Sequence, residues 1–134
     1  MKYILALIAV FALAFPVKAD GFKEGQMFGQ KFFCFYESVI MEYVEYSVED
    51  PQKAIEFFSV SSRSGQCGVL SNVVPVIVKD VLMDYIDAEG DEMQVIEVTL
   101  PNPLKHIQGD KQLFTIALKK LSKDAKMAPS HGNI

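Results

Sequence analysis

The two cysteines are the residues of this chain most suited to chemistry. Cys34 lies in the stretch FFCFY, and Cys67 lies in the stretch SGQCG. A cysteine can act as a nucleophile, can bind a metal ion, or can form a disulfide. The role depends on the partner residues that the chain offers and on the compartment in which it works.

Partners for a reactive cysteine are few. A nucleophilic cysteine needs a histidine close by, and the chain contains only His106 and His131. A zinc site needs about four ligands, and these residues lack the paired spacing of such a site. We therefore expect a disulfide between Cys34 and Cys67, with free-thiol chemistry as the alternative, and we assign no catalytic residue.

The first 19 residues are typical of a signal peptide. Lys2 precedes an uncharged apolar stretch over residues 3–15, and Val17 and Ala19 are the small residues of a cleavage site. A helix over that stretch reaches about 20 Å, whereas the hydrocarbon core of a bilayer is about 30 Å thick. We expect cleavage before Asp20 and export to the periplasm or the cell exterior, where disulfides form. A retained membrane anchor is the alternative.

Charge and size limit the classes of partner. Loss of residues 1–19 would remove Lys2 and Lys18 and no acidic residue, so the net charge would change from −4 to −6. An acidic chain is not attracted to phosphate backbones or anionic lipid, which disfavours nucleic acids and membrane surfaces as partners. The remaining chain suits one domain. We expect no cofactor.

Residues 37–49 form the first predicted helix. Apolar side chains recur there at helical spacing, and Glu42, Glu45 and Glu49 fall on the other side. The stretch is also rich in β-branched and aromatic residues, which favour strands. A strand would scatter the acidic residues over both faces, so the helix is the preferred interpretation.

A second helix follows directly. Asp50 and Pro51 are typical of a helix N-terminus, and Gly65 is typical of a helix end. The residues expected to form its buried stripe are Ala54, Ile55 and Phe58. Two antiparallel helices would bring the flanking cysteines close together, as a disulfide requires.

The second half of the chain predicts strands. The expected segments are residues 73–78 and 81–87, read as one strand bent near Lys79, then 92–100 and 112–118. Pro75 cannot donate to a ladder and should lie at an edge or a strand start. The predicted fold is α+β: a helical hairpin closed by a disulfide and packed on a three-stranded antiparallel β-meander.

The ends of the chain lack a clear pattern. Residues 20–30 contain three glycines and are expected to form a loose arm or a short strand, so the domain is predicted to span 31–118. Residues 119–134 begin with several lysines, which could add a helical turn or two, and end in a polar stretch that should be disordered.

Acidic residues gather at the turn between the first two strands. The set is Asp84, Asp87, Glu89, Asp91 and Glu92. Calcium binds several carboxylate oxygens, so Asp87, Glu89 and Asp91 are candidate ligands, and a hydrolytic carboxylate pair could also be drawn from this turn. The stretch lacks the other ligands of a calcium loop, and a turn has no walls that exclude water. A solvated hairpin tip is the expected interpretation.

Ten aromatic residues crowd into residues 22–58. This exceeds what one face of two short helices needs, so part of the set is predicted to form an exposed patch for a protein partner. The candidates are Phe35, Tyr36, Tyr43 and Tyr46. The alternative is that all these rings pack in the core.

A layout resemblance accompanies these features. Cys34, a helical pair, Cys67-Gly68 and a hairpin with VIEV at residues 95–98 follow one another. This order over residues 31–118 resembles small exported proteins of bacteria and phages with no assigned activity. It implies a one-disulfide α+β domain.

The sequence favours a non-enzymatic, exported protein-binding module, for example an inhibitor or modulator of a cell-envelope enzyme. One alternative is a divalent-cation-binding protein or small hydrolase that uses the turn from Asp84 to Glu92. Another is a structural component of the envelope.

Overall fold

The computed structural model describes residues 21–128. The predicted signal peptide and the end of the predicted disordered tail lie outside these residues. The described elements are, in chain order, β1 Gln26–Cys34, α2 Glu37–Glu49, α3 Pro51–Arg63, β2 Cys67–Ile86, β3 Glu92–Thr99, α4 Leu104–Gln108, β4 Leu113–Leu118, the 3₁₀ helix η2 Lys119–Lys123 and β5 Lys126–Met127. The α+β class is confirmed. No helix within 21–128 is long and apolar enough to cross a bilayer.

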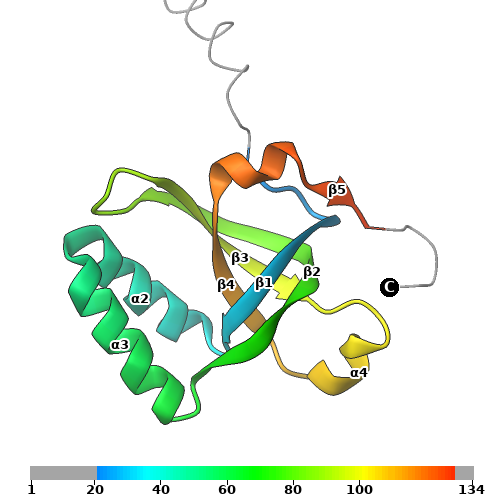
Figure 1. Ribbon diagram of the computed structural model, residues 1–134, viewed down its shortest axis with the longest axis horizontal. Coiled ribbons are helices and arrows are strands. Elements are labelled where there is room, and N and C mark those ends of the chain that lie inside the picture. Colours follow the sequence, from blue (N-terminus) through cyan, green and yellow to red (C-terminus); the bar gives the residue numbers. More distant parts are fainter. Residues whose placement is uncertain (1–20, 129–134) are drawn as a thin grey trace, which may run out of the picture.

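Both predicted helices are present, packed side by side against one side of the sheet (Figure 1). In α2 the stripe around Ile40 and Val44 is buried, whereas the glutamates face solvent. The Asp50 carboxylate accepts a hydrogen bond of 3.0 Å from the main-chain N–H of Gln52 and so caps α3. Gly65 has a φ of 84°, the left-handed conformation that commonly follows a helix.

The sheet has five antiparallel strands in the order β2-β3-β4-β1-β5, and β1 also pairs with β2. The long strand β2 makes this possible: up to Ile77 it pairs with β1, and from Ile77 onward it pairs with β3. Its register shifts between Val78 and Asp80, where the sequence predicted a bend. The sheet therefore curls until β1 meets β4 at Cys34 and Phe114.

The prediction of a three-stranded meander was thus incomplete. The strands β3 and β4 follow the prediction, and β2 contains both predicted segments but already begins at Cys67. β5 was not expected in the sheet, and β1 extends beyond the short strand that was one of the two expectations for residues 20–30. The sequence of β1 contains Gly29 and shows little alternation of apolar and polar residues, so it predicts a strand only weakly. The segment is a strand because it pairs with β2 over most of its length. That pairing joins residues 33 to 50 positions apart, which local sequence patterns do not report.

The predicted loose arm is also corrected, because the described chain is tied to the core from its start. Phe22 is buried at 3% exposure, and the centroid of its ring lies 4.6 Å from that of Phe28. The strand β1 already begins at Gln26. The Phe22 N–H donates a hydrogen bond of 2.7 Å to the side-chain oxygen of Gln94. Residues 119–127, in turn, form η2 and β5, and β5 pairs with β1.

Two buried clusters hold the fold together, one on each face of the sheet. Val76, Ile96 and Leu113 belong to the cluster inside the curl. Val95 and Phe114 belong to the cluster beneath the helices, which also contains both cysteines. Because successive residues of a strand point to opposite faces, both faces of β3 are apolar at its centre.

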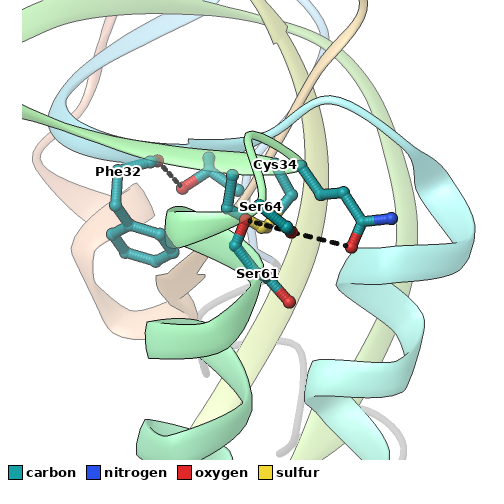
Figure 2. The surroundings of a disulfide bond; sticks show 7 residues. Phe32, Cys34, Ser61 and Ser64 are labelled. Carbon is teal, nitrogen blue, oxygen red and sulfur yellow. Dashed lines mark hydrogen bonds between the residues drawn. A yellow bond between two sulfur atoms is a disulfide. The ribbon is translucent and has the colours of Figure 1, made fainter.

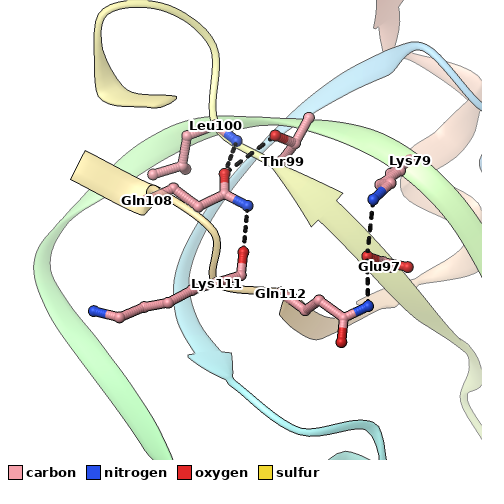
Figure 3. Close-up of polar contacts among 7 residues, drawn as sticks. All are labelled: Lys79, Glu97, Thr99, Leu100, Gln108, Lys111 and Gln112. Atoms are coloured by element: carbon pink, nitrogen blue, oxygen red, sulfur yellow. Dashed lines mark hydrogen bonds and ion pairs between the residues drawn. The ribbon is translucent and has the colours of Figure 1, made fainter. Parts of the chain in front are cut away.

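The connection between β3 and β4 is folded around Gln108 (Figure 3). Its side-chain oxygen accepts hydrogen bonds from the main-chain N–H of Leu100, at 2.8 Å, and from the hydroxyl of Thr99, at 3.1 Å. Its side-chain amide donates to the Lys111 carbonyl at 2.8 Å. One glutamine therefore fixes α4 against the end of β3.

Candidate functional site

The disulfide is confirmed. Cys34 at the end of β1 and Cys67 at the start of β2 are bonded and lie directly opposite one another, with Cα atoms 3.9 Å apart. Both are buried, and Ser61 and Ser64 at the end of α3 lie beside them (Figure 2). No free cysteine remains, so the free-thiol alternative is wrong.

The acidic turn is held by its own hydrogen bonds. The Asp87 carboxylate accepts from the main-chain N–H groups of Glu89, at 3.0 Å, and Asp91, at 2.9 Å. The Ala88 N–H donates to the Ser47 carbonyl at 2.9 Å, which anchors the turn to α2. Within 21–128 no three histidine, cysteine or acidic residues are grouped to hold a metal ion. The turn therefore has the features of a structural hairpin tip.

Asp84 is part of a polar chain that starts from the buried Gln94. The side-chain amide of Gln94 donates to Asp84 at 2.9 Å, and Lys119 forms an ion pair with the same carboxylate at 2.8 Å. Partial burial raises the pKa of Asp84, but the hydrogen bonds from Lys119 and Gln94 and the charge of Lys119 outweigh it. The net pKa lies below the ordinary value, so Asp84 is a poor proton donor near neutral pH.

Two tyrosines lie close to this turn. Burial raises the pKa of Tyr85 to about 12, although a hydrogen bond with Ser47 acts in the opposite direction. Burial and then the charge of Asp87 raise the pKa of Tyr43. Both phenols therefore stay protonated near neutral pH, and neither can serve as a general base there.

The four aromatic candidates are distributed over different environments. Tyr36 is exposed at 57%, whereas Phe35 packs against the inner cluster with Lys111 Nζ 5.9 Å from its ring centroid. Tyr43 and Tyr46 are half-buried and pack on aromatic rings of α3. Of the four, only Tyr43 lines the apolar groove described next.

An apolar groove of about 260 Å³ separates α3 from the adjoining strands. We call it the α3 groove, and it is lined by Lys31, Phe32, Tyr43, Ile55, Phe58 and Val69. Two of these lining residues, Phe32 and Phe58, have ring centroids 5.5 Å apart in an edge-to-face arrangement. Ile55 and Val69 remain 60% and 55% exposed at its rim. The groove can accept an apolar side chain from outside.

The sequence placed Ile55 in the core, and that expectation is wrong. The face of α3 that packs inward is centred on Ala54 and Ser61, the two buried residues of the helix. Because these side chains are small, the backbone of α3 lies close to the rest of the protein and its larger residues are turned sideways or outward. The seven-residue spacing of Ala54 and Ser61 was the signal that could have indicated this packing.

Beside the groove, β2 has an apolar surface of its own. Leu70 and Val73 are exposed at 42% and 63%. They lie in a β-bulge, where residues 70–73 of β2 stand opposite the single residue Lys31 of β1. On its other edge this half of β2 has no strand partner among the described residues. The bulge and Pro75 are features that protect a sheet edge from strand addition, so we do not interpret it as a site for an incoming strand.

No family model matches this chain, and no similarity to a curated protein or to a solved structure was found.

Proposed function

We propose that this protein is an exported binding module that docks a partner protein on α3 and the α3 groove. The observation that carries the proposal is the orientation of α3, which buries Ala54 and Ser61 and exposes Ile55 and Val60. A surface helix normally turns its large apolar residues inward. Large apolar side chains on the outside, next to an open apolar groove, are typical of interaction surfaces.

The charges of α2, the helix that packs beside α3, favour a basic partner, whereas α3 itself carries Lys53 and Arg63 against Glu56. Residues 37–63, which span both helices, contain six acidic and two basic residues. Glu42, Glu45 and Glu49 all lie exposed on the solvent face of α2. A partner that inserts an apolar side chain into the α3 groove would therefore gain from lysines or arginines that lie over α2, mainly through faster association.

The compartment supports this role. A buried disulfide suggests a non-cytoplasmic compartment, because reducing systems keep cytoplasmic thiols free. We place the protein in the periplasm or outside the cell, where a basic envelope enzyme is a suitable class of partner. An inhibitor or modulator of such an enzyme is the specific form of the proposal.

The test compares two matched variants in co-purification from an envelope extract. Ile55→Ser with Val60→Ser removes the apolar surface of α3, whereas Ile107→Ser removes an apolar side chain that is 73% exposed on α4. We expect one basic protein to be retained by the parent and the Ile107 variant and lost by the α3 variant. Equal retention by all three, with circular dichroism unchanged, would contradict docking on α3.

A further inference from the structure

Ile107 protrudes from a segment of fixed conformation. It is the most exposed large apolar side chain within residues 21–128, at 73%. The helix α4 is held in place, because Leu104 packs against the inner cluster and the Gln108 side chain is hydrogen-bonded to the main chain of Leu100 and Lys111. A side chain presented by a fixed segment loses little conformational freedom on binding. Ile107 is therefore suited to insert into an apolar groove on another molecule.

The α3 groove has room for a single side chain. Its volume of about 260 Å³ is below the roughly 300–1,000 Å³ of pockets that hold a whole drug-sized ligand. The proposed function requires that the inserted side chain is apolar and that basic residues accompany it. Ile107 of the same chain meets both conditions, because Lys105 and His106 precede it and Lys111 follows it. All four residues are exposed.

The charges of the two surfaces are complementary. Residues 105–111, which we call the α4 tip, contain two lysines and one aspartate, a net charge of +1 with the histidine neutral. The helix α2, which supplies Tyr43 to the groove, contains four glutamates and no basic residue. One charge of the opposite sign lies on each side, since Lys31 lines the groove and Asp110 belongs to the α4 tip. Within residues 21–128 neither Lys31 nor Asp110 forms an ion pair, so they can pair across a contact between two molecules.

The groove and the α4 tip cannot meet within one molecule. Figure 1 shows α3 and α4 on opposite sides of the molecule, and the hydrogen bonds of Gln108 fix the position of α4. We propose that the α3 groove binds a second copy of this chain, whose α4 tip inserts Ile107 between Ile55 and Val69. The inference rests on the proposed function in one respect, which is that the groove accepts an apolar side chain. The two occupants would compete, so self-association would regulate the access of the partner protein.

Sedimentation equilibrium of the purified, oxidised protein tests the proposal in the absence of any other protein. One inserted side chain makes a small contact, so we expect a dissociation constant on the order of 100 µM and an average mass that rises with protein concentration. The association should weaken as the salt concentration rises, because the charges of the two surfaces are then screened. Ile107→Ser should weaken the association about tenfold or more, as expected for an isoleucine that becomes buried. Ile86→Ser, at an apolar side chain that is 61% exposed at the end of β2, is the matched control and should associate like the parent.

A mixture of two variants tests whether the contact joins the α4 tip to the groove. Ile55→Ser with Val69→Ser removes the apolar rim of the groove and keeps Ile107, whereas Ile107→Ser keeps the groove. Each variant should associate weakly on its own, because one half of the contact is missing. An equal mixture of the two should associate more strongly than either variant alone, because it retains one intact pair of surfaces. Val60→Ser, on α3 but outside the lining of the groove, should associate like the parent.

An average mass that stays constant up to about 1 mM protein would overturn the proposal, because the expected contact is measurable at that concentration. An Ile107 variant that associates like the parent, or a mixture that associates no better than its components, would overturn it as well. The proposed function has a separate outcome, since Ile107→Ser should still retain the basic partner in co-purification. Absence of self-association with retention of that partner would leave a different basic protein as the occupant of the groove. Self-association without retention of any partner would contradict the proposed function alone.

Discussion

The hydroxyl of Thr115 in β4 donates a hydrogen bond of 2.9 Å to the main-chain carbonyl of Phe32 in β1. The two strands share one ladder pair, Cys34 with Phe114, so side chains complete the contact between them. Gln30 makes a second such contact, donating at 2.9 Å to the Ile116 carbonyl. The closure of the sheet therefore depends on a few named side chains next to the disulfide.

Thr115→Val should destabilise the protein by about 1–3 kcal/mol, because valine keeps the shape of threonine but leaves the Phe32 carbonyl without this donor. Urea denaturation at neutral pH measures the effect. Thr99→Val is the matched control, since its acceptor Gln108 keeps the Leu100 N–H as a second donor. Equal urea midpoints for the Thr115 variant and the parent would show that the hydroxyl does not stabilise the closure.

Replacing both cysteines by alanine should lower the free energy of unfolding by about 3.8 kcal/mol in the chain-entropy model for a loop of this length. Urea denaturation of the variant and the parent measures this difference. A separate labelling experiment on the parent protein tests whether the sulfurs are inert. Native oxidised protein should not react with iodoacetamide, whereas reduced and unfolded protein should react at Cys34 and Cys67. Labelling of the native oxidised protein would contradict the structural role of both cysteines.

Gln94→Leu should destabilise the fold by about 2 kcal/mol and release the start of the described chain. Gln94 is buried, and leucine would leave both the Phe22 N–H and Asp84 without their amide partner. Tryptic cleavage after Lys23 under native conditions measures the release. Gln112→Leu, at an exposed glutamine, is the control and should leave the cleavage rate unchanged. Slow cleavage in both variants would show that Gln94 does not hold this segment.

Asp84→Asn should reduce stability at neutral pH and have little effect in acid. The folded-state pKa of Asp84 is lowered, so its contribution is present above the ordinary value of 3.8 and is lost as the pH falls through the lower folded-state value. Half of the side chain is exposed, so the effect should stay below about 1 kcal/mol. Thermal melting from neutral to acid pH measures it, with Glu42→Gln as a control on α2. A difference between variant and parent that grows toward low pH would contradict this assignment.

Millimolar calcium should not change the melting temperature. The Asp87 carboxylate already accepts two main-chain hydrogen bonds, and Glu89 and Asp91 are exposed, with no further ligands grouped around them among residues 21–128. A cation that bound the folded state would raise the melting temperature through linkage. A rise that Asp87→Asn abolished would restore the cation-binding alternative for the turn.

Local signals in the sequence determined the helices and most of the strands. Asp50, Pro51 and Gly65 act through the backbone of their immediate neighbours, and the glutamates of α2 report their solvent face through helical spacing. The bend of β2 near Lys79 and the turn before β3 are local in the same sense. The disulfide was predictable because the chain holds only two cysteines and they flank a pair of helices.

The candidate surfaces, by contrast, were decided by tertiary contacts. Ile55 is apolar and lies at helical spacing, yet it is exposed. The reason is that α3 packs inward on the face that carries the small side chains of Ala54 and Ser61. Phe35, Tyr36, Tyr43 and Tyr46 were expected to form an exposed patch. The α3 groove is instead lined in part by Phe32 and Val69, which come from two different strands. The composition gives the number of such residues but does not show which of them share a face.

The sequence by itself determined the helices α2 and α3, the strands β3 and β4 and most of β2, because those outcomes depend on neighbouring residues. It also determined which sulfurs bond, because two cysteines allow a single pairing. The tertiary structure decided that Gln26 opens a strand, that β1 closes the sheet, and that the Gln26 side chain donates a hydrogen bond to η2 at the Ser122 carbonyl. These outcomes depend on contacts between residues far apart in the chain, whose free energies arise only when the whole core is assembled.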